Sequence, residues 1–194
     1  MLNRIYRVFL KRALDLILAL VLSILLLLPM LIIAVAIRAE SEGSVIFKQE
    51  RRGRGGRVFV CYKFRTMIRD APSNMPASSF QGRELYVTRV GRFLRRSSLD
   101  ELPQLFNVIR GEMSLVGPRP LICEENELHD GRQRAGVYAL RPGITGMAQI
   151  GGRNSLDDRE KLEKDTYYLH NLRPSLDAKI LFSTLSCVIK REGS

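Results

Sequence analysis

Two adjacent carboxylates, Asp100 and Glu101, open a stretch of the sequence that has the features of a helix start. Ser98 and Glu101 have the spacing of a capping box, which predicts that a helix begins here. An ionised Asp at the amino end of a helix can act as a nucleophile or as a ligand for a hard metal ion. Because neighbouring helix residues point about 100° apart, the two carboxyl groups suit separate tasks rather than one shared proton. A pair that merely caps the helix is the alternative.

Basic side chains in restricted backbone form a second group with chemical potential. Prolines flank Arg119 in Gly117-Pro118-Arg119-Pro120 and fix the backbone around it, so its guanidinium could clamp a phosphate. Arg141 precedes a Pro-Gly turn in a similar way, and a rigid turn with a solvent-facing arginine is the alternative in both places. Strand alternation predicts that Lys63 and Arg65 share one face.

The chain as a whole is strongly basic. It has 31 Lys and Arg residues against 20 Asp and Glu residues, and its net charge is +11. This balance favours an anionic partner, namely nucleic acid, anionic lipid or a phosphorylated substrate. Three cysteines without a C-x-x-C motif imply no disulfide framework and favour a reducing compartment.

An uncharged apolar run at residues 16–37 predicts a membrane segment, because a helix of this length spans roughly 33 Å. Basic residues flank the run on both sides, so the positive-inside rule places both ends in the cytoplasm. Pro29 would break the helix at Leu28-Pro29 and allow a re-entrant path, whereas a kinked spanning helix is the alternative. Asp15 is spaced to form an ion pair with Lys11 and Arg12 near the lipid headgroups.

The remaining patterns predict a mainly α fold with a small β-hairpin. Strands at 45–47 and 58–62 flank a basic turn at 51–56, which is either a phosphate cradle or a solvated loop resting on anionic lipid. An amphipathic helix at 174–189, with Asp177 on its polar face, packs on the core or lies in the membrane interface. The predicted organisation is a re-entrant helix-break-helix membrane anchor at residues 1–40, followed by a cytoplasmic catalytic domain with interfacial amphipathic helices at 41–194.

Five motifs follow one another along nearly the whole chain, from about residue 9 to residue 190. They are Lys11-Arg12-x-x-Asp15, YKFRTM at 62–67, SLDELPQLFN at 98–107, Gly117-Pro118-Arg119-Pro120 and RPGITG at 141–146. In this order they resemble the bacterial sugar transferase family, in particular its small monotopic polyprenyl-phosphate phosphoglycosyl transferases. The usual break in that family is Ser-Pro; here Leu28 replaces the serine, so no hydroxyl is present at that position to satisfy a freed carbonyl.

The resemblance implies that a sugar-1-phosphate moves from a UDP-sugar to polyprenyl (undecaprenyl) phosphate, with release of UMP and a requirement for Mg²⁺. Asp100 would attack the β-phosphate and form a covalent phosphosugar intermediate, Glu101 would assist metal or proton handling, and both would be metal ligands. The stretch at 152–154 suggests an N-acetylated amino sugar. The expected phosphate- and substrate-binding residues are Lys63, Arg65, Arg92, Arg95, Arg119, Arg141, Gln149 and Arg153.

The implied partners are the UDP-sugar, polyprenyl phosphate and the lipid bilayer, with no nucleic acid, and a homodimer is left open. The implied location is the cytoplasmic face of the bacterial inner membrane, at the first membrane step of glycoconjugate biosynthesis. One rival is a basic, membrane-anchored protein that binds nucleic acid or lipid without catalysis. A glycosidase is a weaker rival, because its two carboxyl groups must lie at least about 5 Å apart across the sugar.

Overall fold

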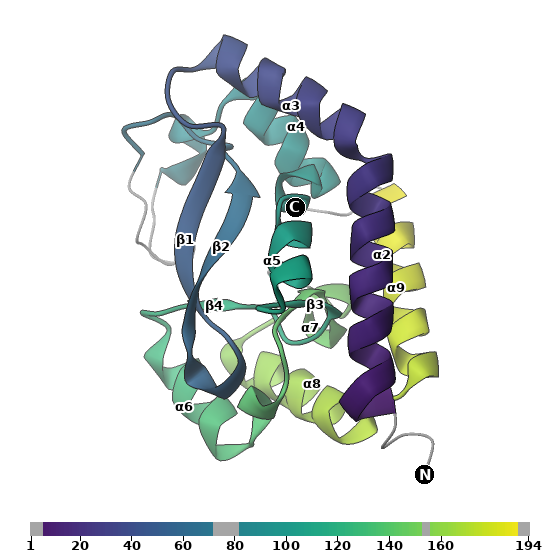
Figure 1. Ribbon diagram of the computed structural model, residues 1–194. Coiled ribbons are helices and arrows are strands. Elements are labelled where there is room, and N and C mark those ends of the chain that lie inside the picture. Colours follow the sequence, from purple (N-terminus) through teal and green to yellow (C-terminus); the bar gives the residue numbers. More distant parts are fainter. Residues whose placement is uncertain (1–5, 72–81, 153–155, 190–194) are drawn as a thin grey trace.

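The computed structural model describes residues 6–71, 82–152 and 156–189 of the 194-residue chain. Two apolar helices, α2 (Lys11–Leu25) and α3 (Leu27–Glu40), form an arch along one side and the top of the molecule (Figure 1). The hairpin of β1 (Ile46–Arg52) and β2 (Val58–Phe64) lies on the opposite side. The predicted mainly helical fold with a small hairpin is confirmed.

The two helices of the arch meet at a 60° bend, and the residue at the break is Leu26. Pro29 lies in the first turn of α3, where its missing N–H is harmless. If α2 continued straight, the ring of Pro29 would clash with the carbonyl of Leu25, four residues earlier. The predicted break at Leu28-Pro29 is therefore wrong in position, because the proline causes a bend that lies upstream of it.

The arch carries the apolar length that a membrane segment needs only when both helices are taken together. Among the described residues, no single helix is long and apolar enough to cross a bilayer, whereas the bent α2–α3 pair passes the same test. Its outward side chains are largely uncovered, with Ile24, Leu28 and Val35 each about two-thirds exposed or more. A re-entrant path for this pair stays a prediction.

β1 and β2 pair antiparallel with Ile46 opposite Phe64 and Arg52 opposite Val58. The short strand β4 (Leu121–Ile122) pairs with the carboxyl end of β1. Arg51 and Arg52 therefore belong to a strand, not to the predicted turn, which contains only a 3₁₀ turn at Arg54–Gly56. Pairing with β2 explains the difference, because Arg51 and Arg52 lie opposite Phe59 and Val58, so the strand continues past its predicted end.

A second, two-stranded sheet was not predicted. β3 (Ser114–Val116) pairs in parallel with β5 (Gly143–Thr145). The backbones approach closely beside it: a Cβ placed on Gly143 would lie 2.1 Å from the Gly117 nitrogen. Glycines at both positions thus allow the chain after β3, which contains Arg119, to lie against the start of β5.

In the described part of the chain, six further α-helices pack around these sheets. Two short ones, α4 (Arg89–Ser97) and α5 (Gln104–Arg110), lie between the hairpin and the arch (Figure 1). The larger core includes Val108, Met113, Tyr168 and Ile180, and a smaller core joins the arch to β2 and α4. The remaining four are α6 (Asn126–Arg134), α7 (Met147–Ile150), α8 (Asp158–Asn171) and α9 (Pro174–Ile189).

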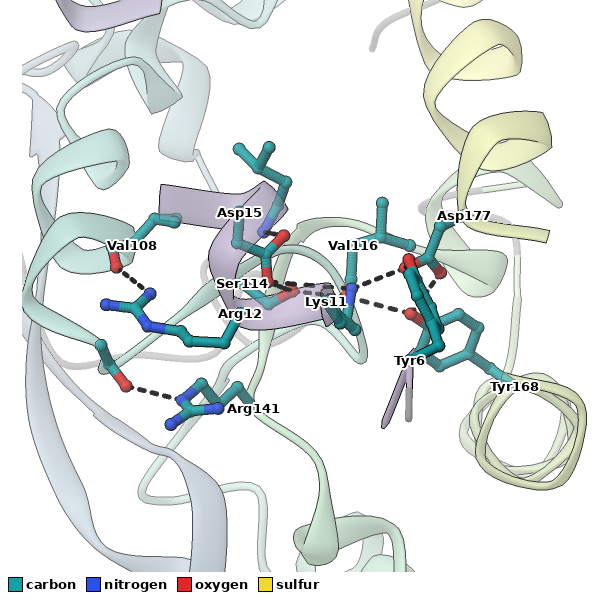
Figure 2. Close-up of polar contacts among 12 residues, drawn as sticks. Tyr6, Lys11, Arg12, Asp15, Val108, Ser114, Val116, Arg141, Tyr168 and Asp177 are labelled. Atoms are coloured by element: carbon teal, nitrogen blue, oxygen red, sulfur yellow. Dashed lines mark hydrogen bonds and ion pairs between the residues drawn. The ribbon is translucent and has the colours of Figure 1, made fainter. Parts of the chain in front are cut away.

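A buried polar cluster ties the start of the arch to α9 (Figure 2). The Asp177 carboxylate accepts hydrogen bonds from the hydroxyls of Tyr6 and Tyr168, each at 2.6 Å, and from Lys11 Nζ at 2.7 Å. We call these four residues the anchor lock. Asp177 is thus buried rather than on a solvent-facing polar side of α9, because its hydrogen-bond partners come from other elements.

The predicted ion pair of the anchor is only partly confirmed. Lys11 lies 3.9 Å from Asp15, but its shorter contact is with Asp177. Arg12 does not pair with Asp15, because its guanidinium donates to the carbonyls of Val108 and Ile109 at the end of α5 (2.6 and 3.1 Å). Both carbonyls lie at the carboxyl end of a helix, where a cation is favoured.

Asp15 is buried and its carboxylate accepts from the Ser114 hydroxyl at 2.7 Å and from the Leu115 N–H at 3.2 Å. The KRxxD motif therefore docks α2 on α5 and β3, and its position near lipid headgroups stays a prediction. α3 ends at Glu40, but α2 shares the larger core, and the division of the chain at residue 40 stays a prediction.

Candidate active site

Asp100 and Glu101 lie in a 3₁₀ turn, Leu99–Glu101, between α4 and α5. The predicted capping box is wrong: Ser98 adopts a left-handed conformation (φ 56°) and its side chain makes no capping hydrogen bond. Its N–H instead bonds to the carbonyl of Arg95, so Ser98 ends α4. Pro103 directly precedes α5 and separates the carboxylates from that helix.

Glu101 contacts two other predicted site residues, Lys63 and Arg119. Its Oε1 lies 2.7 Å from Lys63 Nζ on β2 and 3.4 Å from Arg119 Nη1 on the loop between β3 and β4. Asn107 fixes α5 to β2, because its side chain accepts from the Tyr62 N–H and donates to the Val60 carbonyl. The hairpin, the 3₁₀ turn and the Arg119 loop therefore converge at one point.

Two opposing effects act on the pKa of the Asp100 carboxyl. Burial raises the pKa of its carboxyl above the ordinary value, while the positive charge of Lys63, and then those of Arg119 and Arg95, act in the opposite direction. The predicted position of Asp100 at the amino end of a helix is not observed, because its turn is separate from α5. The neighbouring cations reduce the rise in the pKa of Asp100 that burial causes.

The backbone of Arg119 is fixed by residues that sequence reasoning did not select. Its carbonyl accepts from Arg132 Nη1 at 2.8 Å, and Arg132 forms a fully buried ion pair with Asp165 on α8 at 2.5 Å. Arg51 donates to the next carbonyl, that of Pro120, at 3.1 Å. The Arg119 side chain itself stays half exposed and able to contact a ligand.

A small pocket lies beside Glu101, and its volume is about 10 Å³. This is room for a single water molecule, so a phosphate group would bind at its mouth rather than inside it. Alternation along both strands of the hairpin could have identified Arg51, because Arg51, Cys61 and Lys63 share the inward face in the observed register. The pocket is lined by Arg51, Cys61, Lys63, Glu101, Gln104, Arg119, Pro120, Gly143 and Ile144.

Arg95 and Arg92 belong to the predicted set, but neither lines this pocket. Arg95 is near Asp100, and its Nε donates to the Thr66 hydroxyl at 2.9 Å. Arg92 is exposed on α4. The prediction that Arg65 shares a face with Lys63 is wrong, because β2 ends at Phe64 and the Arg65 guanidinium turns to the carbonyls of Ser41 and Glu42.

Three more predicted residues lie outside the pocket. Arg141 donates from Nε to the Gly111 carbonyl at 2.9 Å and lines a different cavity. Gln149 is buried in α7, and neither its Nε2 nor its Oε1 has a hydrogen-bond partner among the described residues. Arg153 lies outside the described residues.

The carboxylates allow a limited test of the predicted Mg²⁺ site. Within the described parts of the chain, no group of three or more His, Cys, Asp and Glu side chains is placed to hold a metal ion. Mg²⁺ is commonly bound through one or two carboxylates together with substrate phosphates and water. Asp100 and Glu101 fit that limited donor set, with the remaining ligands supplied by substrate and solvent.

Comparison with known proteins defines the class to which this arrangement belongs. The family model described as bacterial sugar transferase matches residues 6–191. The chain therefore belongs to the bacterial sugar transferase family, as the five sequence motifs predicted.

Individual relatives place the chain more closely within that family. It is 41% identical over 186 residues to the uncharacterized sugar transferase EpsL of Bacillus subtilis, covering 95% of this chain and 89% of the relative. It is 42% identical over 195 residues to the UDP-N-acetylgalactosamine-undecaprenyl-phosphate N-acetylgalactosaminephosphotransferase of Aeromonas hydrophila, covering 96% of this chain and 45% of the relative. Similarity to the undecaprenyl-phosphate galactose phosphotransferase of Salmonella typhimurium is 36% over 201 residues, covering 96% and 42%. The chain thus spans less than half the length of several curated relatives that it matches.

Proposed function

We propose that this chain transfers a sugar-1-phosphate from a UDP-sugar to undecaprenyl phosphate and releases UMP. Membership of the bacterial sugar transferase family supports this proposal, as do relatives named for the transfer of galactose, N-acetylgalactosamine and glucose phosphates. The observation that carries it is the convergence of Asp100, Glu101, Lys63 and Arg119, two carboxylates with two cations. Moving a phosphoryl group between two anions needs mainly such positioning and charge neutralisation.

In the proposed reaction, a carboxylate oxygen of Asp100 attacks the β-phosphorus of the UDP-sugar. A new bond forms between that oxygen and the phosphorus, and the bond to the α-phosphate oxygen breaks, so UMP leaves with the electron pair. A phosphate oxygen of undecaprenyl phosphate then attacks the same phosphorus and restores the Asp100 carboxylate. Each bulky substrate thus meets the enzyme in a separate step.

The neighbouring side chains supply the electrostatics of both steps. Lys63 and Arg119 are placed to bind the phosphate oxygens whose charge grows during transfer, and Arg132 and Arg51 hold the backbone of Arg119. Glu101 keeps the two cations together before substrate binds. Mg²⁺, held by Asp100 and Glu101, would neutralise charge on the diphosphate.

We also propose that α2 and α3 enter the bilayer from the cytoplasmic face of the bacterial inner membrane and return to it. The bend at Leu26, the exposed apolar side chains of both helices and the basic residues on either side of them support this path. For the sugar we propose an N-acetylated amino sugar, although relatives of comparable identity are named for three different sugars. A panel of UDP-sugars assayed for UMP release would identify it.

The decisive experiment replaces Asp100 with Asn in the full chain. Without a carboxylate nucleophile, UMP release from a UDP-sugar in the presence of undecaprenyl phosphate and Mg²⁺ should fall below detection, and no radiolabelled phosphosugar should remain on the protein. Asp158→Asn is the matched control, since Asp158 is a half-exposed carboxylate at the start of α8. Undiminished turnover by Asp100→Asn would remove Asp100 as the nucleophile.

A further inference from the structure

A second cavity, separate from the Glu101 pocket, lies between the hairpin tip and the residues that follow α5. Its volume is about 550 Å³, large enough for a small ligand, and its walls include Arg54, Arg57, Phe59, Gly111, Glu112 and Arg141. None of these residues lines the pocket that contains Lys63, Glu101 and Arg119. The two sites adjoin along the hairpin, since Phe59 of this cavity lies directly opposite Arg51 of the other, on the same face of the strands.

The cavity is cationic, because its positive side chains outnumber its negative ones. Three arginines face one carboxylate, and that carboxylate, Glu112, accepts from the Asn107 side chain at 2.7 Å. Among the described residues, no carboxylate lies within ion-pair distance of Arg54, Arg57 or Arg141. Crowded like charges cost free energy that a bound anion would recover.

Arg141 is fixed in a way that leaves part of its guanidinium available. Its Nε donates to the Gly111 carbonyl at 2.9 Å, and its two Nη groups make no hydrogen bond to the described residues (Figure 2). Burial lowers the pKa of the Arg141 guanidinium, and the positive charges of Arg54 and Arg12 lower it further. Other cationic side chains therefore lie near Arg141. Two adjacent Nη groups on a planar fork match the oxygens of a phosphate.

The hairpin tip opposite Arg141 is open to a ligand. Gly55 and Gly56 have positive φ angles of 67° and 73°, and a Cβ placed on either would meet nothing within 4 Å. The turn therefore presents Arg54 and Arg57 without side chains between them that would block approach. Arg12, on the anchor helix, lies on the other side of Gly111, so the cavity adjoins the point where the chain enters α2.

We propose that this cavity binds a phosphate group through Arg54, Arg57 and Arg141, at a site distinct from the Glu101 pocket. The phosphate belongs either to a lipid headgroup beside the anchor or to a soluble ligand, and the two sources present the same chemistry. The proposal holds whether or not Asp100 is the nucleophile, because it uses none of the residues of the proposed reaction.

The test uses a thiol reporter inside the cavity. Val58 lines it and is 55% exposed, so Val58→Cys is placed in a full chain that also carries Cys123→Ser and Cys187→Ser, with buried Cys61 retained. The rate of reaction with N-ethylmaleimide, a neutral reagent, is measured in maltoside micelles against increasing inorganic phosphate, with chloride at equal ionic strength as reference. Phosphate should slow the reaction at least threefold along a saturating curve, and chloride should not.

Charge-neutral variants assign the effect to the arginines. Arg54→Gln with Arg57→Gln should abolish the protection, and it leaves the Arg141–Gly111 bond untouched; Arg54→Gln with Arg141→Gln should do the same. Arg159→Gln, which removes an equally positive but exposed side chain of α8, should keep it. Protection that persists in both neutral variants would overturn the proposal.

A second arm identifies the source of the phosphate. The same reporter is measured in phosphatidylglycerol nanodiscs without added phosphate. Arginine-dependent protection in nanodiscs identifies a lipid headgroup, and protection by free phosphate alone identifies a soluble ligand. Absence of protection in both media would overturn the proposal.

Discussion

At the scale of single residues, the candidate site is a balance between burial and cations. Burial alone would favour the protonated form of Asp100, and Lys63 is the strongest of the neighbouring charges that oppose it. The same ammonium also holds Glu101 at 2.7 Å. Lys63 thus serves two carboxylates at once, and its removal should change the ionisation of one and the position of the other.

The pH dependence of transfer tests the role of Lys63. In the proposed reaction the carboxylate form of Asp100 is the nucleophile, so activity should be present above its pKa and lost as pH falls through it. Lys63→Gln should raise that pKa further and move the acidic limb of kcat/KM to higher pH, with a plateau lower by roughly 10²-fold. Lys63→Arg should keep the limb in place. An unmoved limb in Lys63→Gln would show that Lys63 does not control the ionisation of Asp100.

His129 provides a residue-scale test that does not depend on catalysis. It is buried, its Nε2 lies 2.8 Å from the Ile122 carbonyl, and its Nδ1 contacts the Tyr138 hydroxyl. Burial lowers the pKa of the His129 imidazole, so below an unfolded-state pKa of about 6.5 the unfolded chain binds more protons than the folded one. The free energy of unfolding should therefore decrease as pH falls from 7.5 to 5.

His129→Gln should flatten that pH dependence, because its amide stays neutral and can still bond to both partners. The measurement is urea unfolding in maltoside micelles at several pH values. His170→Gln, at an exposed position, is the control and should leave the slope as in the natural chain. An equal slope in His129→Gln would contradict this assignment.

Residues that act through local motifs were predictable, and residues that act through tertiary contacts were not. Asp100, Glu101, Lys63 and Arg119 were selected from charge and from the spacing of proline, and the structure brings the last three together. Arg132 and Asp165 were missed because their ion pair joins α6 to α8, far apart in sequence. Arg141 was assigned to the same site because its Pro-Gly turn looks similar, but its guanidinium bonds to the Gly111 carbonyl and lines a different cavity.

At the scale of elements, the arch and the hairpin have boundaries that differ from the predicted ones. Pro29 causes a break at Leu26, upstream of itself, and pairing with β2 makes Arg51 and Arg52 strand residues. The β3–β5 sheet could not be predicted, because strands of three residues leave too little alternation to recognise. The long amphipathic helix α9 was predicted, because its apolar stripe recurs over several turns.

The path of the arch predicts which side of the membrane each flank occupies. If α2 and α3 return to the face they enter, cysteines at positions 3 and 50 should both react with an impermeant maleimide from the cytoplasmic side only. A cysteine in place of Leu28, an exposed apolar position near the bend, should resist labelling in the bilayer. Reaction of the two flanking positions from opposite sides would refute the re-entrant path.

At the scale of the whole molecule, the anchor lock makes the arch part of the folded body. Tyr6 and Lys11 bind Asp177 on α9, while Asp15 and Arg12 bind β3 and α5, so α2 is fixed from two directions (Figure 2). The basic residues at its start thereby stabilise tertiary structure rather than only meeting lipid. Stability of the catalytic body and placement of the anchor should respond to the same substitution.

Asp177→Asn should lower the free energy of unfolding by about 1–3 kcal/mol, because Lys11 loses its nearest negative partner in a buried setting. Urea unfolding of the full chain in maltoside micelles measures this loss. Asp158→Asn breaks an ion pair with Lys161 whose carboxylate is 53% exposed, and it should cost no more than about 0.5 kcal/mol. Equal losses in the two variants would contradict a stabilising lock.

The lock also sets an order of events during synthesis. Lys11 and Asp177 are 166 positions apart, so a ribosome adding roughly 5–20 residues per second adds Asp177 roughly 8–33 s after Lys11. During that interval Lys11 lacks the partner of its shorter ion pair in the folded chain. If the arch enters the bilayer as proposed, its entry and the closure of the body around it are therefore successive events, and the membrane is the first partner of a helix whose partner on α9 has yet to be made.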